Sequence, residues 1–258
     1  EQMFTAVATL AGHAMARARR YDTEHQMVRA LQSMLLPVLP PRWGPIRLAA
    51  TYRPVLTSSG VGGDWYDVLD TAHGPAVVIG DVVGKGIRAA GVMGQLRIAT
   101  RTMADRHDPS AVLGSLDELA NELVDAWMTS VVYVVVDIAE SRITLAVAGH
   151  PPPLLLQPDR PPMWLDACVG PPLGVELGPR GTSSVAYEGV ARLVLYTDGL
   201  VERRDQSIDV GLARLRDVAY GLSDLEGDEF VERLVAEMTS EADQQDDIAV
   251  LCADLGRD

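Results

Sequence analysis

Four aspartates stand where a carboxylate can be held at a strand end or in a tight turn. They are Asp64 after two glycines, Asp81 at the start of Asp-Val-Val-Gly-Lys-Gly, Asp198 within Thr-Asp-Gly, and Asp246 at the start of an Asp-Asp pair. If these carboxylates met, they would repel one another, and a divalent cation would remove that cost. All-oxygen ligands suit Mg²⁺ or Mn²⁺, whereas zinc and copper sites usually include His or Cys. Spacing alone does not bring four turns together, because an isolated Asp-Gly is most often an ordinary turn residue.

Other chemistries have little support in the sequence. It contains no GxxxxGK[ST] loop, no GxSxG nucleophile elbow and no Cys-His nucleophile pattern, and its five histidines include no HExxH pair. Gly84-Lys85-Gly86 could hold a phosphate through backbone N–H groups, but it is too short to be a phosphate-loop signature. A metal-dependent reaction is therefore favoured over nucleophilic catalysis by a side chain.

The elements that must position these aspartates are mostly strands joined by short turns. Alternating or short apolar runs predict strands over 46–52, 76–83, 131–138, 143–148, 154–156, 192–196 and 248–253. Helical spacing predicts helices over 87–104, 111–127, 210–220 and 228–239, and gives the second a buried stripe made of Val112, Leu116, Leu119, Leu123 and Trp127. Because hairpins outnumber crossover connections, we expect an α+β fold with antiparallel sheets and helices on their outer faces.

A separate helical segment precedes the strands. Residues 1–36 carry apolar side chains in steps of three and four, interrupted by Arg17 and Glu24, and Pro37 ends the pattern. Two interpretations remain open, a coiled-coil seam that joins two copies or a helix packed on its own domain. We therefore divide the chain into an N-terminal linker helix, 1–40, and a globular domain, 41–258.

Composition limits the partners and the compartment. The chain has 36 acidic and 22 basic residues, a net charge of −14, which argues against a nucleic-acid or anionic-membrane surface. No apolar run approaches the roughly 20 residues that a membrane helix needs. Cys168 and Cys252 lie far apart without CxxC spacing and fit a reducing cytoplasm, where both are expected to be small core residues.

Six segments resemble the metal-dependent protein phosphatase family, in particular its bacterial SpoIIE-like branch. In chain order they are Val61-Gly62-Gly63-Asp64-Trp65-Tyr66-Asp67, Asp81-Val82-Val83-Gly84-Lys85-Gly86, Ala148-Gly149-His150-Pro151-Pro152-Pro153, Gly170-Pro171-Pro172-Leu173-Gly174, Tyr196-Thr197-Asp198-Gly199-Leu200-Val201-Glu202 and Gln245-Asp246-Asp247-Ile248. The resemblance implies an αββα sandwich of two antiparallel sheets. It also implies a serine/threonine phosphatase that uses two Mn²⁺ or Mg²⁺ ions and a metal-activated water.

The resemblance also implies roles for single residues. The position of Asp81 bridges the two ions, and the backbone carbonyl of Val82 helps to hold them. Asp198 and Asp246 match ligands of one ion, Asp64 matches a ligand of the other, and Asp247 is expected to support them.

Several positions depart from the family pattern or allow two interpretations. Ala249 replaces a common Thr or Ser, so a hydroxyl that could orient Asp246 is missing, and Lys85 stands where many relatives have His. Arg53 is only a loose candidate for binding substrate phosphate. His150 could be a general acid, but its proline-rich setting favours a structural role. Trp65 and Tyr66 are expected to pack against the sheet rather than touch substrate.

The wider function is also implied by resemblance. The end of the 1–36 helix is similar to connectors from GAF or PAS sensory domains, and relatives dephosphorylate STAS-type anti-anti-sigma proteins that regulate a sigma factor. A phosphorylated STAS protein is therefore the expected substrate, an upstream GAF or PAS domain the expected regulator, and a homodimer through 1–36 a further expectation. The alternatives are a catalytically inactive interaction module and a fragment that serves chiefly to dimerise.

Overall fold

The computed structural model describes most of the globular domain and little of the N-terminal segment. The described residues are 12–13, 15–17, 19, 36–55, 62–104, 108–166, 169–175, 178, 180–239, 244 and 246–256. The two interpretations of the 1–36 helix therefore concern residues that lie almost entirely outside this set, and so does the prediction for Cys168.

Two sheets form the centre of the domain. The first has the order β1 (Arg42–Trp43), β2 (Ile46–Arg53), β12 (Ile248–Leu255), β11 (Ala191–Tyr196), β7 (Leu154–Leu156) and β8 (Met163–Trp164), and all its neighbours are antiparallel. The second has the order β10 (Ser183–Ala186), β6 (Arg142–Ala148), β5 (Ser130–Asp137), β4 (Gly74–Asp81) and β3 (Trp65–Thr71). β9 (Val169–Gly170) adds to β6 in parallel, so the prediction of antiparallel sheets holds for every described pairing except this short one.

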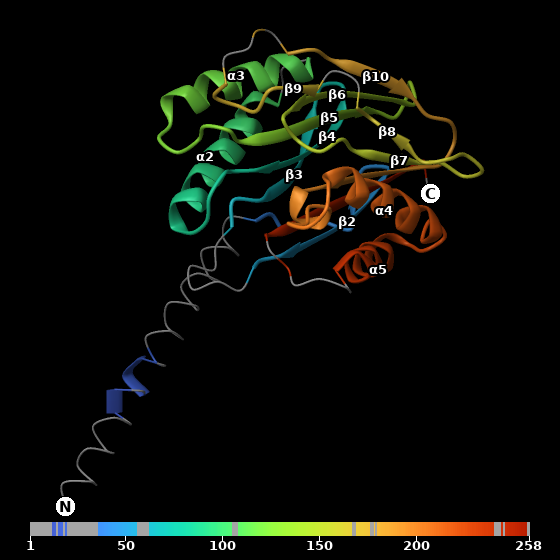
Figure 1. Cartoon of the computed structure of the whole chain (residues 1–258). Coiled ribbons are helices and arrows are strands. Elements are labelled where there is room, and N and C mark those ends of the chain that lie inside the picture. Colours follow the sequence, from blue (N-terminus) through green and yellow to red (C-terminus); the bar gives the residue numbers. More distant parts are fainter. Residues whose placement is uncertain are drawn as a thin grey trace, which may run out of the picture.

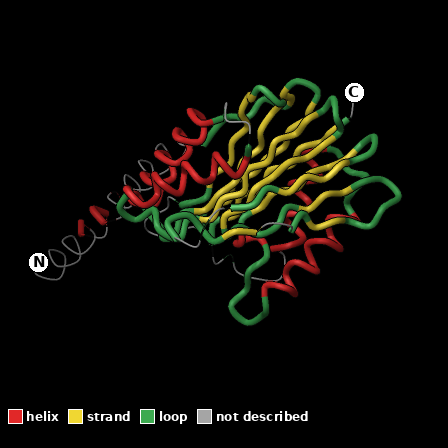
Figure 2. Tube along the Cα trace, turned by 90° about the horizontal axis from the view of Figure 1, so that it is seen from above, coloured by secondary structure: helices red, strands yellow, loops and turns green. Residues whose placement is uncertain are grey.

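Helices cover the outer face of each sheet. α2 (Ile87–Met103) and α3 (Pro109–Glu122) pack on the second sheet, and α4 (Ile208–Gly221) and α5 (Gly227–Thr239) pack on the first (Figures 1 and 2). A short 3₁₀ helix, η1 (Asp198–Leu200), follows β11. This arrangement confirms the predicted αββα sandwich. None of the helices in the described part of the chain is long and apolar enough to cross a membrane.

Three apolar layers follow from the period of two along each strand. On β12, Ala249 and Leu251 face the layer between the sheets, whereas Val250 and Cys252 face α4 and α5. Cys252 is almost fully buried, as predicted for a core residue. Burial of these layers supplies the main driving force for folding, at about 25 cal/mol for each Å² of apolar surface removed from water.

A buried charge on β3 fixes α2 against its sheet. The Asp67 side chain is fully buried and accepts hydrogen bonds from Arg97 Nε at 2.9 Å and from Arg101 Nε at 2.7 Å. Because a buried carboxylate without partners would be strongly destabilising, the two arginines allow this position to be charged. The contact sets the position of α2, whose first turn follows the short loop after Asp81, the last residue of β4.

Most predicted elements agree with the structure, and the hairpin over 131–148 is confirmed by the pairing of β5 with β6. The strands β1, β3, β8, β9 and β10 were not predicted, since four of them have only two to four residues and β3 begins within a glycine-rich motif. The strand predicted over 76–83 ends at Asp81.

The predicted helix over 111–127 was wrong at both ends. α3 starts earlier because Asp108 caps it, with its side chain accepting from Ser110 N. It ends at Glu122, because Leu123 is extended and Asp125 has a positive φ of 70°. Trp127 consequently lies beyond the helix and is 64% exposed, so it does not belong to the buried stripe that Val112 and Leu116 begin.

Candidate metal centre

Both sheets bring carboxylates to one end of the sandwich. In the second sheet Trp65 pairs with Gly80, which places Asp64, just before β3, opposite Asp81 at the end of β4. In the first sheet Tyr196 pairs with Val250, so Asp198 after β11 and Asp246 before β12 lie near the same end. The structure therefore collects the four predicted aspartates from four strand ends.

Asp64 and Asp81 are joined by a side-chain hydrogen bond. Burial, the Asp81 charge and a side-chain hydrogen bond to Asp81 raise the pKa of Asp64 well above 3.8. Burial raises the pKa of Asp81 to about 7, with the charges of Asp198 and Asp246 adding to the effect and the hydrogen bond from Asp64 opposing it. The hydrogen bond thus raises the pKa of Asp64 and lowers that of Asp81, so Asp64 is the carboxyl of the pair that keeps a proton to the higher pH.

The carboxylates of the first sheet complete this acidic cluster. Burial, followed by the charges of Asp246 and Glu202, raises the pKa of Asp198 to about 6. Lys85 Nζ lies 3.0 Å from Asp246 Oδ1. The Asp246 carboxylate is therefore paired with the ammonium group that the β4–α2 loop contributes.

Thr197 is a member of the site to which sequence reasoning gave no role. Its buried hydroxyl donates to Asp64 Oδ2 at 2.6 Å and accepts from the backbone N–H of Ala249 at 2.9 Å. It therefore fixes the Asp64 carboxylate from the opposite sheet. Its position between Tyr196 and Asp198, within a segment that resembles the phosphatase family, is the signal that could have identified it.

The same contacts bear on the departure at position 249. The Ala249 methyl group lies in the apolar layer between the sheets, and it is the backbone N–H of this residue that faces Thr197. Thr197 therefore supplies a hydroxyl near Asp64, although position 249 has none. Whether the alanine weakens the orientation of Asp246 stays a prediction.

Gly63 is required by a close backbone approach. Val82 N donates to Gly63 O at 3.2 Å, and a Cβ added at Gly63 would lie 2.2 Å from the Val82 carbonyl oxygen. No side chain fits at this position without moving the β4–α2 loop. The glycine thereby holds the Val82 carbonyl beside the aspartate cluster.

Asp247 supports the loop that carries Asp246. Its buried side chain accepts from the backbone N–H of Val55 at 2.7 Å, and burial, as the largest cause, raises its pKa. Its own backbone N–H donates to Asp246 Oδ1 at 2.9 Å. This geometry agrees with the supporting role expected of Asp247.

Other candidate residues lie where packing explains them. His150 is buried, with Nδ1 2.7 Å from Ser130 Oγ and Nε2 3.1 Å from the Tyr196 carbonyl oxygen. Burial lowers its pKa to about 4, so the ring is neutral near pH 7 and both nitrogens are engaged; this favours the structural role. Trp65 and Tyr66 are buried in the layers on either side of the second sheet, as expected for packing residues.

The donor set fits divalent cations. Within the described residues no three acidic, His or Cys side chains already surround a common point in metal-binding geometry. Even so, carboxylates from both sheets raise one another's pKa, which is the unfavourable state that a bound cation would relieve. Oxygen ligands alone suit Mg²⁺ or Mn²⁺.

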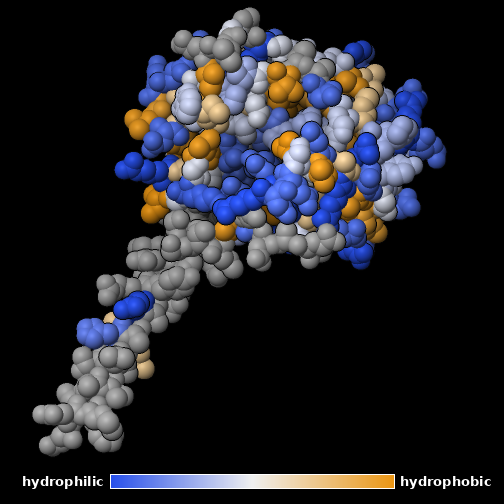
Figure 3. All heavy atoms as spheres, in the orientation of Figure 1, coloured by the Kyte–Doolittle hydropathy of each residue, from blue (hydrophilic) through white to orange (hydrophobic). Residues whose placement is uncertain are grey.

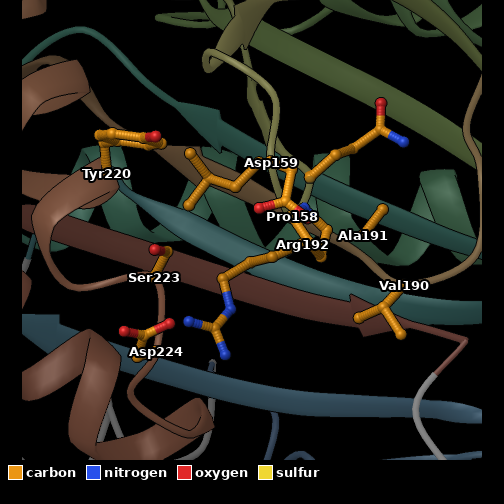
Figure 4. A pocket seen from close by; sticks show the side chains of 10 residues that line it. Pro158, Asp159, Val190, Ala191, Arg192, Tyr220, Ser223 and Asp224 are labelled. Atoms are coloured by element: carbon orange, nitrogen blue, oxygen red, sulfur yellow. The ribbon is translucent and has the colours of Figure 1, made fainter.

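A hollow lined by described residues lies at the other end of β11 from Asp198. It has a volume of about 360 Å³ and is bordered by the end of β7, the start of β11 and the α4–α5 turn, with Arg192, Tyr220, Ser223 and Asp224 among its lining residues (Figure 4). Arg192 donates two hydrogen bonds to Asp254, from Nε to Oδ1 at 2.5 Å and from Nη2 to Oδ2 at 3.0 Å. This hollow is separate from the aspartate cluster.

Comparison with known proteins identifies the family. Residues 71–256, well over half of the chain, match the family model described as Stage II sporulation protein E (SpoIIE), a range that begins after Asp64. Phosphoserine phosphatase RsbP of Bacillus subtilis is 32% identical over 153 residues, which are 56% of this chain and 38% of the relative. Phosphoserine phosphatase RsbU of the same organism is 29% identical over 132 residues, 50% of this chain and 38% of the relative. The chain thus spans well under half the length of these two relatives.

Solved structures agree on the fold. The RsbU and RsbW domains of Rv1364c from Mycobacterium tuberculosis match with a TM-score of 0.76 and 26% identity, covering 81% of this chain and 60% of that one. The SiaA-PP2C domain of Pseudomonas aeruginosa matches with a TM-score of 0.76 and 21% identity, covering 95% of this chain and 99% of that one. The family match over residues 71–256 shows that the chain belongs to the SpoIIE family, and these solved structures share its fold.

Proposed function

We propose that residues 41–258 are a metal-dependent protein serine/threonine phosphatase and that residues 1–40 are the helix that relays a signal to it. The observation that carries this proposal is the buried pair Asp64 and Asp81, which are hydrogen-bonded to each other and lie near further carboxylates. Such a cluster is costly to the folded domain on its own, and it becomes favourable once cations replace the protons.

The ligand assignment is carried over from the family resemblance, and the gathering of the four aspartates at one end of the sandwich supports it. Asp81 would lie between two Mn²⁺ or Mg²⁺ ions, Asp198 and Asp246 would hold one, and Asp64 the other, with the Val82 carbonyl as a further ligand. When bound, such ions lower the pKa of a shared water and offset charge on the phosphoryl oxygens of the substrate.

The remaining residues of the site act by orienting these ligands. Thr197 fixes the Asp64 carboxylate, since its hydroxyl donates to Asp64 Oδ2. Lys85 neutralises Asp246 while no cation does so, and its ammonium group would become available to the substrate phosphate when a cation displaces it. His150 takes no part in proton transfer, because both ring nitrogens are occupied and its pKa lies far below 7.

The substrate proposed is a phosphorylated STAS-type anti-anti-sigma protein, whose dephosphorylation regulates a sigma factor. The support is similarity to two proteins named phosphoserine phosphatases, RsbP and RsbU, together with the ordered family motifs. We further propose a cytoplasmic location, an upstream GAF- or PAS-type sensory domain and a homodimer through residues 1–36.

Phosphate release from a panel of phosphorylated STAS proteins, with Mn²⁺ and Mg²⁺ compared, tests the activity. We expect D81N to abolish metal-dependent release and D166N, an exposed carboxylate after β8, to leave it unchanged. Undiminished turnover by D81N would refute the ligand assignment. Binding of a STAS protein without any turnover at saturating Mn²⁺ would instead favour the inactive interaction module.

A further inference from the structure

Five apolar side chains are exposed next to the aspartate cluster. We call them the rim patch: Val83 (58% exposed), Ile87 (68%), Val124 (81%), Trp127 (64%) and Met128 (36%). Single exposed apolar residues are common on protein surfaces and need no explanation, but a group of them beside a candidate active site indicates an interaction surface. Figure 3 shows hydrophobic residues scattered over the visible face of the domain, including the side where α2 and α3 lie.

Strand pairing places the rim patch beside Asp81. Asp81 pairs with Ser130, the first residue of β5, and Met128 and Trp127 lie two and three residues before Ser130, at the same end of the sheet as Asp81. Val83 follows Asp81 by two residues in the loop that leads to α2. Arg88 Nη1, on the first turn of α2, lies 3.7 Å from Asp125 Oδ2 and links the two halves of the patch.

The turn that carries Trp127 is anchored on both sides. Ala126 is fully buried, and its carbonyl oxygen accepts from Thr129 Oγ1 at 2.8 Å. Met128 N donates to the Leu173 carbonyl oxygen at 2.9 Å although Met128 has a positive φ of 66°. A bulky residue rarely adopts this conformation, so the turn is held in place by its surroundings. Trp127 is therefore exposed on a well-fixed turn, not on a frayed helix end.

We infer that the rim patch is the docking surface for the phosphorylated protein substrate and contacts apolar side chains that flank its phosphoserine. This inference rests on the proposed phosphatase function. The β4–α2 loop and the Trp127 turn border Asp81, so a protein whose phosphoserine reaches Asp81 is large enough to contact them, whereas a small phosphoester reaches the same carboxylates without covering them. Trp is the residue type that most often dominates binding energy at protein interfaces, and Trp127 is the largest side chain of the patch.

The test compares two substrates on the full chain with Mn²⁺: a phosphoseryl STAS protein and p-nitrophenyl phosphate. The variants are W127S and V124S. The matched control is I98S, since Ile98 is 65% exposed on α2 and lies three turns from Ile87. We expect W127S to lower kcat/KM for the phosphoprotein by about 10-fold or more, mainly through KM, with turnover of p-nitrophenyl phosphate changed less than about twofold. The control is expected to match wild type on both substrates.

Other results overturn the inference. Unchanged phosphoprotein kinetics in W127S and V124S would show that the patch does not bind substrate, and equal losses on both substrates would mean that the substitutions disturb the centre itself. Sedimentation velocity distinguishes a second copy, because dissociation of a dimer by W127S with unchanged kinetics would make the patch a self-association surface. Failure of the wild-type chain on both substrates would refute the phosphatase proposal, and the docking inference with it.

Discussion

Replacing Asp81 by Asn should remove activity and yet stabilise the metal-free domain. Asp81 is buried against Asp64 and is influenced by the charges of Asp198, Asp246 and Asp247. Ionisation of this carboxyl is therefore unfavourable in the folded state when no cation is present. An amide of nearly the same shape carries no charge and retains an acceptor oxygen for the Asp64 hydroxyl.

The magnitude follows from the raised pKa. A shift from 3.8 to about 7 corresponds to roughly 4 kcal/mol, at about 1.4 kcal/mol for each pKa unit. Because folding raises this pKa, the carboxyl does not destabilise the folded state below pH 3.8, where it is protonated in both states. The free energy of unfolding then falls as the pH rises from 3.8 through about 7. Relaxation of the loops and entry of water reduce the effect, so we expect D81N to gain about 2 kcal/mol at pH 8, or roughly 4–8 °C in Tm.

Thermal and urea unfolding in EDTA at pH 5 and pH 8 measure this effect. The stability advantage of D81N should be larger at pH 8 than at pH 5, and D166N should follow wild type at both. Saturating Mn²⁺ should reverse the order at pH 8, because a ligand at 100 times its Kd stabilises the folded wild type by about 2.7 kcal/mol. If D81N is less stable than wild type in EDTA at pH 8, or if the two have the same pH dependence, the electrostatic account of the cluster is refuted.

Three further substitutions test the supporting contacts. G63A should destabilise the domain by about 1–3 kcal/mol, since its Cβ meets the Val82 carbonyl oxygen, and it should weaken Mn²⁺ binding measured by calorimetry. The control G91A, in open space on α2, should stabilise the domain by up to about 1 kcal/mol. T197V should cost about 1–3 kcal/mol in urea unfolding and reduce Mn²⁺ affinity, because it leaves Asp64 Oδ2 without its donor; unchanged affinity would exclude an orienting role. D67N should cost about 3 kcal/mol at pH 7 by loosening α2, with an unaltered urea midpoint as the contrary result.

Much of the fold could be predicted from local patterns. The strands over 131–138 and 143–148 were recognised because apolar runs flank a polar turn, and both exist within one residue of the predicted ends. The end of α3 was missed because apolar spacing continues to Trp127 while the backbone turns at Leu123. Short edge strands such as β9 and β10 depend on neighbours for their hydrogen bonds and have no comparable pattern of their own.

The sequence by itself determined the chemical types at the site and their order along the chain. Four aspartates at turns, the adjacent glycines and the scarcity of other chemistry indicated oxygen ligands for Mg²⁺ or Mn²⁺. Only the tertiary structure decided that Asp64 faces Asp81, that Thr197 reaches across from the other sheet and that Trp127 stands beside the cluster. The physical reason is that strand register and sheet packing bring together residues more than a hundred positions apart. Sequence periodicity indicates only which face of a helix or strand is buried.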